Sequence, residues 1–366
     1  MGKKTVGDNH PCYIIAEIGS NFNGSLSLAK KLIKLAKKSG ADIVKFQTWI
    51  TEDLCLKNTE KAEYQKEQTG EKGSQFEMIK KLELNYDDFT KLKNYCDKKE
   101  IIFMSTPDEE KSAKFLTEKL KVPAIKIGSG ELTNISYLKI LASLGKPLIV
   151  STGMSDMGEI KKAHKELTRG NQEIIFLHCT TDYPTKLEDV NLNAMLTIKK
   201  EIGTLVGYSD HTEGIMVPLV AAALGATIIE KHFTYDRMAN GPDHKASLSP
   251  SQLKEMIQEI RKLETLSNEK RLIKVKNKIG EKLFNLIAGS YEKKPTERER
   301  ENKSIIQKSI VIKNNLQSGT VLEKKDIIMK RANTKGITSD RYKEVIGKKL
   351  KKEMKKNELL SFEALE

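Results

Sequence analysis

The sequence predicts a (β/α)8 barrel followed by a small β-rich domain. Short apolar runs bounded by turn residues recur along the first 235 positions, and longer amphipathic segments rich in Lys and Glu separate them. Eight such runs alternating with helices are typical of a (β/α)8 barrel. The alternation stops after one more helix, and short strands and turns at close spacing follow from residue 305 onward.

Each predicted element follows from this pattern in chain order. The predicted strands are 13–18, 42–48, 101–105, 124–127, 148–151, 174–179, 205–208 and 227–233. The predicted helices between them are 27–38, 86–98, 109–119, 133–144, 157–167, 193–202 and 215–224. A last helix over 249–266 ends the barrel domain, which we expect at 1–266. The charged segment 267–303 predicts a linker with some helix, and 304–366 the small domain.

Composition and charge exclude several classes of protein. The apolar runs are shorter than the roughly 20 residues that a membrane span needs, and the N-terminus has no apolar signal-peptide core, so we expect a cytoplasmic protein without a membrane partner. The four cysteines form no Cys-x-x-Cys pair and are expected to be reduced. The net charge of +14 comes from lysines interspersed with glutamates, which favours a solvated surface over a nucleic-acid partner and suits an anionic small substrate.

Polar side chains stand at the carboxyl ends of nearly all predicted strands, where the loops of a barrel form a shared mouth. In chain order they are Glu17, Lys45, Gln47, Thr106, Lys126, Ser129, Glu131, Ser151, Tyr183, Ser209, His211 and His232. Because polar groups are costly to bury without partners, a ligand-binding ring is the economical interpretation. The alternative for each residue is a hydrogen bond to the backbone at its strand end.

Two groups within this ring point to particular chemistry. His211 and His232 follow neighbouring strands, so their imidazoles could converge on a divalent metal such as Mn or Zn, although single histidines are more often structural. Lys126, Ser129, Ser209 and the run 151–153 could cradle a phosphate. The sequence has no Walker loop, Gly-x-Gly-x-x-Gly fingerprint or Gly-x-Ser-x-Gly elbow, which argues against nucleotide hydrolysis, nicotinamide chemistry and serine hydrolysis.

The order of the motifs resembles the sialic acid synthase family over almost the whole chain. The matching motifs are AEIGSNFNG at 16–24, KFQT at 45–48, STP at 105–107, KIGSGE at 126–131, STGM at 151–154, CTTDYP at 179–184, GYSDHT at 207–212, EKHF at 230–233 and GPDH at 241–244. The final module, with MKR at 329–331 and GIT at 336–338, resembles the antifreeze-like SAF domain of the same family.

The resemblance implies that phosphoenolpyruvate (PEP) condenses with the aldehyde of an N-acylated mannosamine-type sugar, giving a nine-carbon 2-keto acid and, by C–O cleavage, phosphate. It implies a divalent ion, Mn²⁺ or Mg²⁺, on His211 and His232, which would polarise the aldehyde. The PEP contacts that it implies are Lys126, Ser129, Ser151, Ser209, Thr181 and Tyr183. The sugar contacts are Glu17, Lys45, Gln47, Thr106, Asp243 and Arg331.

Further roles follow from the same resemblance. Glu131 and Glu17 join the two histidines as catalytic residues, and Glu131 is the candidate for proton transfer, with a salt bridge to Lys126 as the alternative. Arg331 would reach into the partner subunit's barrel to recognise the N-acyl group, which implies a domain-swapped homodimer.

The acceptor sugar stays open between N-acetylmannosamine and 2,4-diacetamido-2,4,6-trideoxymannose. The run TTDYP at 180–184 looks closer to legionaminate-type synthases, and Thr181 stands where some N-acetylneuraminate synthases carry Asn. The alternatives are another PEP-dependent synthase, of the 3-deoxy-octulosonate or pseudaminate type, and a non-catalytic sugar-binding barrel. The C-terminal module argues against a synthase of the 3-deoxy-octulosonate type, and the intact pair of His211 and His232 argues against a non-catalytic barrel.

Overall fold

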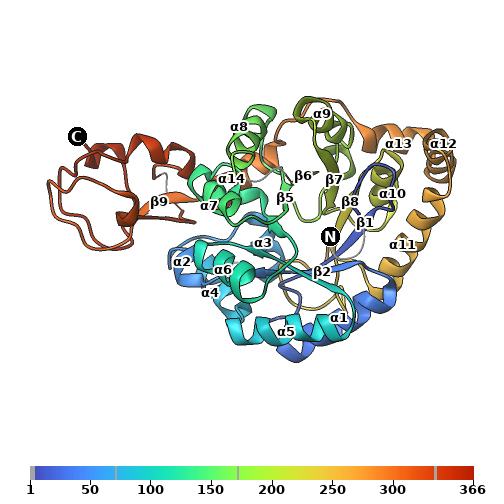
Figure 1. The fold of residues 1–366 in the computed structure, drawn as a ribbon, viewed down its shortest axis with the longest axis horizontal. Helices are drawn as coiled ribbons and strands as arrows, with labels where there is room; N and C mark the ends of the chain where they lie inside the picture. Colours follow the sequence, from blue (N-terminus) through green and yellow to red (C-terminus); the bar gives the residue numbers. More distant parts are fainter. Residues whose placement is uncertain (1–4, 71, 171–172, 334–335) are drawn as a thin grey trace.

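The computed structural model describes residues 5–70, 72–170, 173–333 and 336–366, and it contains the predicted barrel (Figure 1). The strands are β1 (Tyr13–Gly19), β2 (Ile43–Thr48), β3 (Ile102–Pro107), β4 (Ile125–Ile127), β5 (Leu148–Ser151), β6 (Ile174–His178), β7 (Leu205–Asp210) and β8 (Ile228–His232). All their pairings are parallel, in the order β3-β2-β1-β8-β7-β6-β5-β4. Strands β3 and β4 lie beside each other, so the sheet curls into a nearly closed barrel.

All the predicted barrel helices form, and several of them begin at a side-chain cap. They are α1 (Leu26–Ser39), α5 (Tyr86–Lys98), α6 (Glu110–Lys114) with the π-helical turn Phe115–Lys119, α7 (Ile135–Ser143), α8 (Met157–Leu167), α9 (Asn193–Ile202), α10 (Met216–Ala223) and α11 (Pro250–Glu264). The Ser25 hydroxyl accepts from Leu28 N at 3.3 Å to start α1, and Gly40, at φ 95°, ends it in a conformation that glycine adopts without a Cβ clash.

The alternation of side chains along each strand places the polar ring. Tyr13 and Ile15 of β1 point into the barrel and pack with Ile43, Met104 and other apolar residues of its interior. The next inward position of β1 is Glu17, two residues beyond Ile15, and the same step leads from Ile43 to Lys45. The residues between them face outward and pack under the helices in the main core. The barrel is therefore apolar inside at one end and polar at its carboxyl end.

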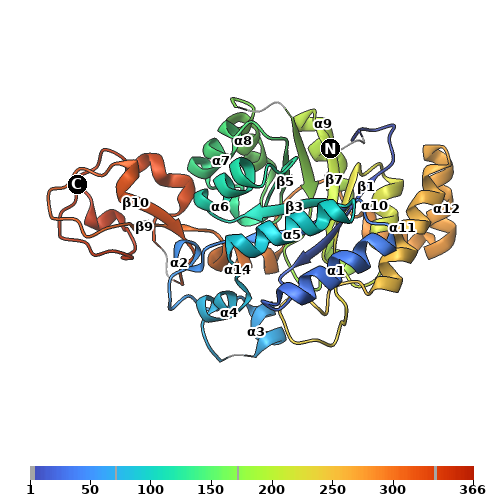
Figure 2. The ribbon, with the colours of Figure 1, turned by 60° about the horizontal axis from the view of Figure 1, so that its bottom comes forward.

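A helical excursion that the sequence did not predict follows β2. It comprises α2 (Thr51–Leu54), α3 (Glu63–Thr69) and α4 (Gln75–Leu82), and it lies between the barrel and the C-terminal domain (Figure 2). Trp49, Leu54, Cys55, Ile79 and Leu82 form its own small core. The excursion thus walls one side of the barrel mouth.

The segment predicted as a linker carries three helices: α12 (Asn268–Ile279), α13 (Glu281–Ala288) and α14 (Glu297–Ile306). Val275, Phe284 and Ile287 are buried in the main core, so α12 and α13 pack on the barrel. Helix α14 then leads into the C-terminal domain.

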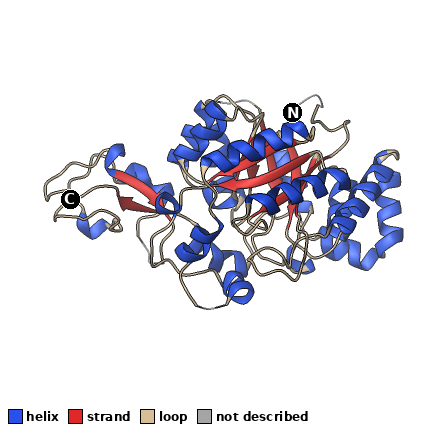
Figure 3. Cartoon of the chain, turned by 90° about the horizontal axis from the view of Figure 1, so that it is seen from below, coloured by secondary structure: helices blue, strands red, loops and turns tan. Residues whose placement is uncertain are grey.

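The C-terminal domain is small and consists largely of turns and isolated bridges (Figure 3). Strands β9 (Ser309–Ile312) and β10 (Ile327–Lys330) pair in antiparallel fashion over a separate core that includes Ile310, Leu322 and Leu350. Short 3-10 helices occur in the two domains at Ser129–Glu131, Leu187–Asp189, Lys324–Asp326, Ser339–Glu344 and Phe362–Ala364. In the part of the chain that the structure describes, no helix is long and apolar enough to cross a membrane.

Candidate active site at the barrel mouth

One cavity at the carboxyl ends of the strands brings together every site residue that the sequence predicts. It is lined by Glu17, Lys45, Gln47, Thr106, Lys126, Ser129, Glu131, Ser151, Thr181, Tyr183, Ser209, His211, His232, Asp243 and Arg331. Fourteen of these come from the barrel domain, and Arg331 comes from the C-terminal domain.

One side of the cavity is a pocket of hydroxyl groups around the buried ammonium of Lys126. Lys126 Nζ donates to Ser151 Oγ at 2.5 Å, and Ser129 Oγ accepts from Gly153 N at 3.0 Å. A Cβ on Gly153 would lie 2.1 Å from Thr181 Oγ1, so the loops after β5 and β6 approach as closely as only a glycine permits. Thr181 Oγ1 is buried and has no hydrogen-bond partner within the described residues. These groups are suited to hold a phosphate or carboxylate.

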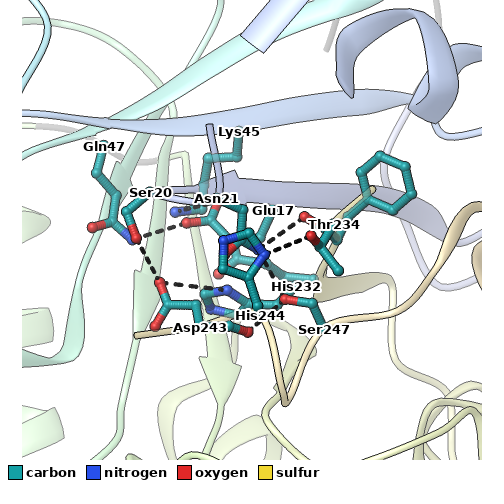
Figure 4. A network of polar contacts seen from close by, with 12 residues as sticks. Glu17, Ser20, Asn21, Lys45, Gln47, His232, Thr234, Asp243, His244 and Ser247 are labelled. Carbon is teal, nitrogen blue, oxygen red and sulfur yellow. Dashed lines mark hydrogen bonds and ion pairs between the residues drawn. The ribbon is translucent and has the colours of Figure 1, made fainter. Parts of the chain in front are cut away.

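The adjoining side is a buried charge network on β1 and β2. Glu17 lies 2.8 Å from Lys45 Nζ and accepts from Gln47 Nε2 at 2.9 Å, while Lys45 Nζ also donates to Thr106 Oγ1 at 3.0 Å (Figure 4). Burial raises the pKa of Glu17 to about 7, against the opposing effect of Lys45. Burial works against the charge of Lys45, but Glu17 and Glu230 outweigh it and raise the pKa of Lys45.

The two histidines face each other at the cavity, with ring centroids 5.5 Å apart. His211 Nδ1 lies 2.6 Å from the Thr180 carbonyl oxygen, to which it donates as the N–H tautomer, so Nε2 is left as the acceptor nitrogen. His232 Nδ1 is buried without a hydrogen-bond partner among the described residues and lies 3.9 Å from Asp243 Oδ2 (Figure 4). Burial lowers the pKa of His211 to about 4 and that of His232 well below its usual value.

Neutral imidazoles with one oriented and one open nitrogen fit a divalent metal. No group of three His, Cys, Asp or Glu side chains around one point occurs in the described ranges, so His211 and His232 would be the two protein ligands. The Tyr183 ring packs against the His211 ring, with centroids 4.1 Å apart and an interplanar angle of 38°, and covers this side of the cavity.

Glu131 has a different partner from the one that the sequence suggested. Its Oε1 lies 2.7 Å from Lys308 Nζ, and its Oε2 accepts from Asn134 Nδ2 at 2.9 Å. The alternative of a salt bridge to Lys126 is wrong, because Lys126 instead lies 3.8 Å from Glu230. Both members of the Glu131–Lys308 pair are buried, and Glu131 lies at the edge of the cavity.

Several charged residues of the site were not predicted from the sequence, among them Glu230 and Lys308. Glu230 is buried at the centre, accepts from Ser209 Oγ at 3.1 Å, and keeps Oε2 without a hydrogen-bond partner among the described residues. It is the inward residue two positions before His232, so strand alternation was a signal for it. Lys308 had no such signal, because it arrives from the start of the C-terminal domain.

The excursion after β2 supplies an apolar wall that was also missed. The Tyr64 ring packs against the Tyr183 ring with centroids 4.8 Å apart and an interplanar angle of 32°. The cavity beside it is lined by Leu54, Met78, Ile79 and Leu82.

Arg331 reaches the mouth of its own chain's barrel. Its backbone N donates to Leu54 O at 2.9 Å, and its carbonyl accepts from Leu56 N and from Thr59 Oγ1, each at 3.0 Å. The Nε atom of Arg331 is buried without a hydrogen-bond partner in the described part of the chain. The guanidinium group therefore stands at the cavity with donors to spare.

Comparison with known proteins agrees with this geometry. The model of the NeuB family matches residues 32–271, and that of the SAF domain matches residues 307–366. The chain is 41% identical to N,N'-diacetyllegionaminic acid synthase of Legionella pneumophila, over 100% of this chain and 98% of that protein. It is 33% identical to the human N-acetylneuraminate-9-phosphate synthase, over 94% and 90%.

Among solved structures, the spore coat polysaccharide biosynthesis protein SpsE of Bacillus subtilis superposes with a TM-score of 0.81 at 29% identity, covering 100% of this chain and 98% of that chain. The family match covers most of the barrel, and the domain match covers nearly all of the C-terminal module. The chain is an enzyme of the NeuB family that ends in a SAF domain.

Proposed function

We propose that the protein is a nonulosonate synthase, which condenses PEP with an N-acylated amino-sugar aldehyde to give a nine-carbon 2-keto acid and phosphate. The observation that carries this proposal is the single cavity in which the Lys126 hydroxyl pocket adjoins the His211 and His232 pair. An anionic reactant and an aldehyde could meet there.

The proposed reaction balances with one water molecule. Carbon 3 of PEP forms a bond to the aldehyde carbon, and the aldehyde oxygen takes up a proton. Water adds to carbon 2, and the bond from carbon 2 to the phosphate oxygen breaks, which leaves a ketone and releases phosphate. A divalent ion on His211 and His232, Mn²⁺ or Mg²⁺, would supply Lewis-acid polarisation of the aldehyde.

The side chains of this chain have distinct roles in that scheme. Lys126, Ser129, Ser151 and Ser209 would bind the phosphate and carboxylate of PEP, and Thr181 would add its free hydroxyl. Asp243 accepts from Ser20 Oγ at 3.1 Å and lies at the sugar side, where it would accept from sugar hydroxyls.

Proton transfer requires an acceptor with a free lone pair, and two carboxylates meet that condition differently. Glu230 has an unpartnered Oε2 inside the cavity, whereas both oxygens of Glu131 already have partners. We therefore add Glu230 to Glu131 and Glu17 as a candidate.

The apolar wall favours the 2,4-diacetamido-2,4,6-trideoxy sugar as the acceptor. That sugar carries two acetyl methyl groups and a C6 methyl group, and burying a methyl group against Leu54, Met78, Ile79 and Leu82 is favourable by about 0.8 kcal/mol.

An assay of phosphate release tests the proposal. Purified protein is incubated with PEP, Mn²⁺ and one of three acceptors: N-acetylmannosamine, its 2,4-diacetamido-6-deoxy analogue, or arabinose 5-phosphate. We expect release with the two amino sugars, faster with the diacetamido sugar, and none with the pentose phosphate. No release with any acceptor rejects the synthase, and release with arabinose 5-phosphate alone would favour the octulosonate type.

We also propose that the SAF domain is exchanged between two subunits of a homodimer. The contacts of Arg331 with Leu54, Leu56 and Thr59 can form within one chain or, by a two-fold exchange, between two. Co-expression of an Arg331→Ala chain with a His211→Ala chain tests this. If the SAF domains are exchanged, the Arg331→Ala chain supplies an intact barrel and the His211→Ala chain supplies an intact Arg331 to it. Activity at low sugar concentration then rises above that of either variant alone. Without exchange, the activity does not rise.

A further inference from the structure

Helix α14 crosses the barrel mouth on its way to the SAF domain and binds the loops of the proposed phosphate pocket. Glu299 and Asn302 lie on its buried side, with exposed fractions of 1% and 2%. Neither residue touches the cavity itself. Two of the residues whose backbone they bind, Met154 and Thr181, do line it.

Glu299 joins the loop after β5 to the loop after β6. Its Oε1 accepts from Met154 N at 2.7 Å and from Thr181 N at 2.9 Å, and its Oε2 accepts from Thr296 N at 3.0 Å. One carboxylate oxygen thus links the two loops directly, in addition to the bridge that Ser129 Oγ makes between Gly153 N and Cys179 Sγ. Hydrogen bonds to an ionised acceptor are roughly twice as strong as neutral ones, so this link is stiff.

Asn302 completes the hold on Thr181. Its Nδ2 donates to the Thr181 carbonyl at 2.8 Å, so α14 binds both the N–H and the C=O of that residue. With its backbone fixed on both sides, Thr181 presents an unpartnered Oγ1 to the cavity. The same hydroxyl lies where a Cβ of Gly153 would be, so a small shift of Thr181 would open or close the pocket.

A buried lysine accompanies Glu299. Lys293 is buried beside it; burial lowers the pKa of this lysine, and Glu299 acts in the opposite direction. The Glu299 side chain therefore accepts hydrogen bonds from three backbone N–H groups in a site that also contains a buried lysine.

We propose that Glu299 and Asn302 are positioning residues, which set the distance between the Met154 and Thr181 loops and thereby the affinity of the pocket for the phosphate of PEP. This inference rests on the proposed function. The alternative is that the two side chains only anchor α14 and so contribute to stability without changing the affinity for PEP.

Steady-state kinetics with each substrate varied separately distinguishes the two roles. Glu299→Ala removes both acceptor oxygens and with them all three hydrogen bonds, Glu299→Gln keeps a neutral carbonyl acceptor, and Asn302→Leu keeps the shape but removes the donor. We expect the KM for PEP to rise about tenfold in Asn302→Leu, more in Glu299→Ala, and by an intermediate factor in Glu299→Gln, while the KM for the sugar changes less than about twofold. Glu301→Gln, an exposed position on the same helix, is the control and should match wild type.

Thermal unfolding of each variant accompanies the kinetics. If Glu299→Ala fails to fold, Glu299→Gln and Asn302→Leu decide the question. A lower melting temperature with both KM values unchanged, or an equal rise in both, overturns the positioning role. Wild-type protein that releases no phosphate rejects the proposed function instead, so the two failures are distinguishable.

Discussion

Replacing Gly153 with alanine would place a methyl group at the narrowest point of the proposed phosphate pocket. The new Cβ would lie 2.1 Å from Thr181 Oγ1, 2.8 Å from Ser129 Oγ and 3.2 Å from Cys179 Sγ, whereas ordinary contacts begin near 3.4 Å. The β5 and β6 loops would have to separate by about 1 Å, and overpacking of this kind costs about 1–3 kcal/mol of unfolding free energy.

The functional loss should exceed the loss of stability, because a misplacement of about 1 Å can reduce catalysis by about a hundredfold. Phosphate release at saturating sugar and varied PEP gives kcat/KM for PEP, and urea unfolding gives the stability. We expect kcat/KM for PEP to fall by about that factor. The double variant Gly153→Ala/Thr181→Ala removes the closest contact, so it should regain most of the stability but not the affinity for PEP.

The reasoning would be refuted if Gly153→Ala bound PEP and unfolded as wild type does. It would also be refuted if the double variant recovered full kcat/KM, because the Thr181 hydroxyl would then have no part in binding.

Three further predictions concern other parts of the molecule. Burial lowers the pKa of His178 to about 3, so the unfolded chain binds a proton below about pH 6.5 that the folded protein excludes, and stability falls as the pH drops. Between pH 7 and pH 5, the free energy of unfolding measured with urea should therefore fall by about 2 kcal/mol less for His178→Gln than for wild type. An equal fall for both proteins would contradict this prediction. Arg331→Ala should raise the KM for the sugar more than the KM for PEP. An unchanged KM for the sugar would show that the SAF domain does not take part in sugar recognition. His211→Ala should abolish phosphate release with little change in circular dichroism, and so should treatment of wild-type protein with EDTA. Added Mn²⁺ should restore phosphate release to the EDTA-treated wild type but not to His211→Ala. Full turnover by His211→Ala would contradict the proposal that His211 is a metal ligand.

Local sequence pattern was sufficient for most of the barrel. The predicted bounds of α5, α8 and α9 match the structure, because capping residues and amphipathic spacing are properties of neighbouring residues. The short helices α2, α3 and α4 were missed, since their residues form a stable core only with each other and with the mouth that they cover. The burial of Val275 and Phe284, in the segment predicted as a linker, was missed for the same reason. Their side chains are buried only because the segment packs on the outer surface of the barrel.

The sequence by itself determined most of the residues that ring the mouth, because strand alternation turns every second residue into the barrel and the parallel order gathers the carboxyl ends of all the strands at one end. Only the tertiary structure decided which of them pair. Glu131 binds Lys308 rather than Lys126, and Glu299 binds the backbone of Thr181 118 positions away. Charge pairing depends on distances of a few ångströms between residues far apart in the chain, and only the packing of α14 and the SAF domain against the barrel fixes those distances.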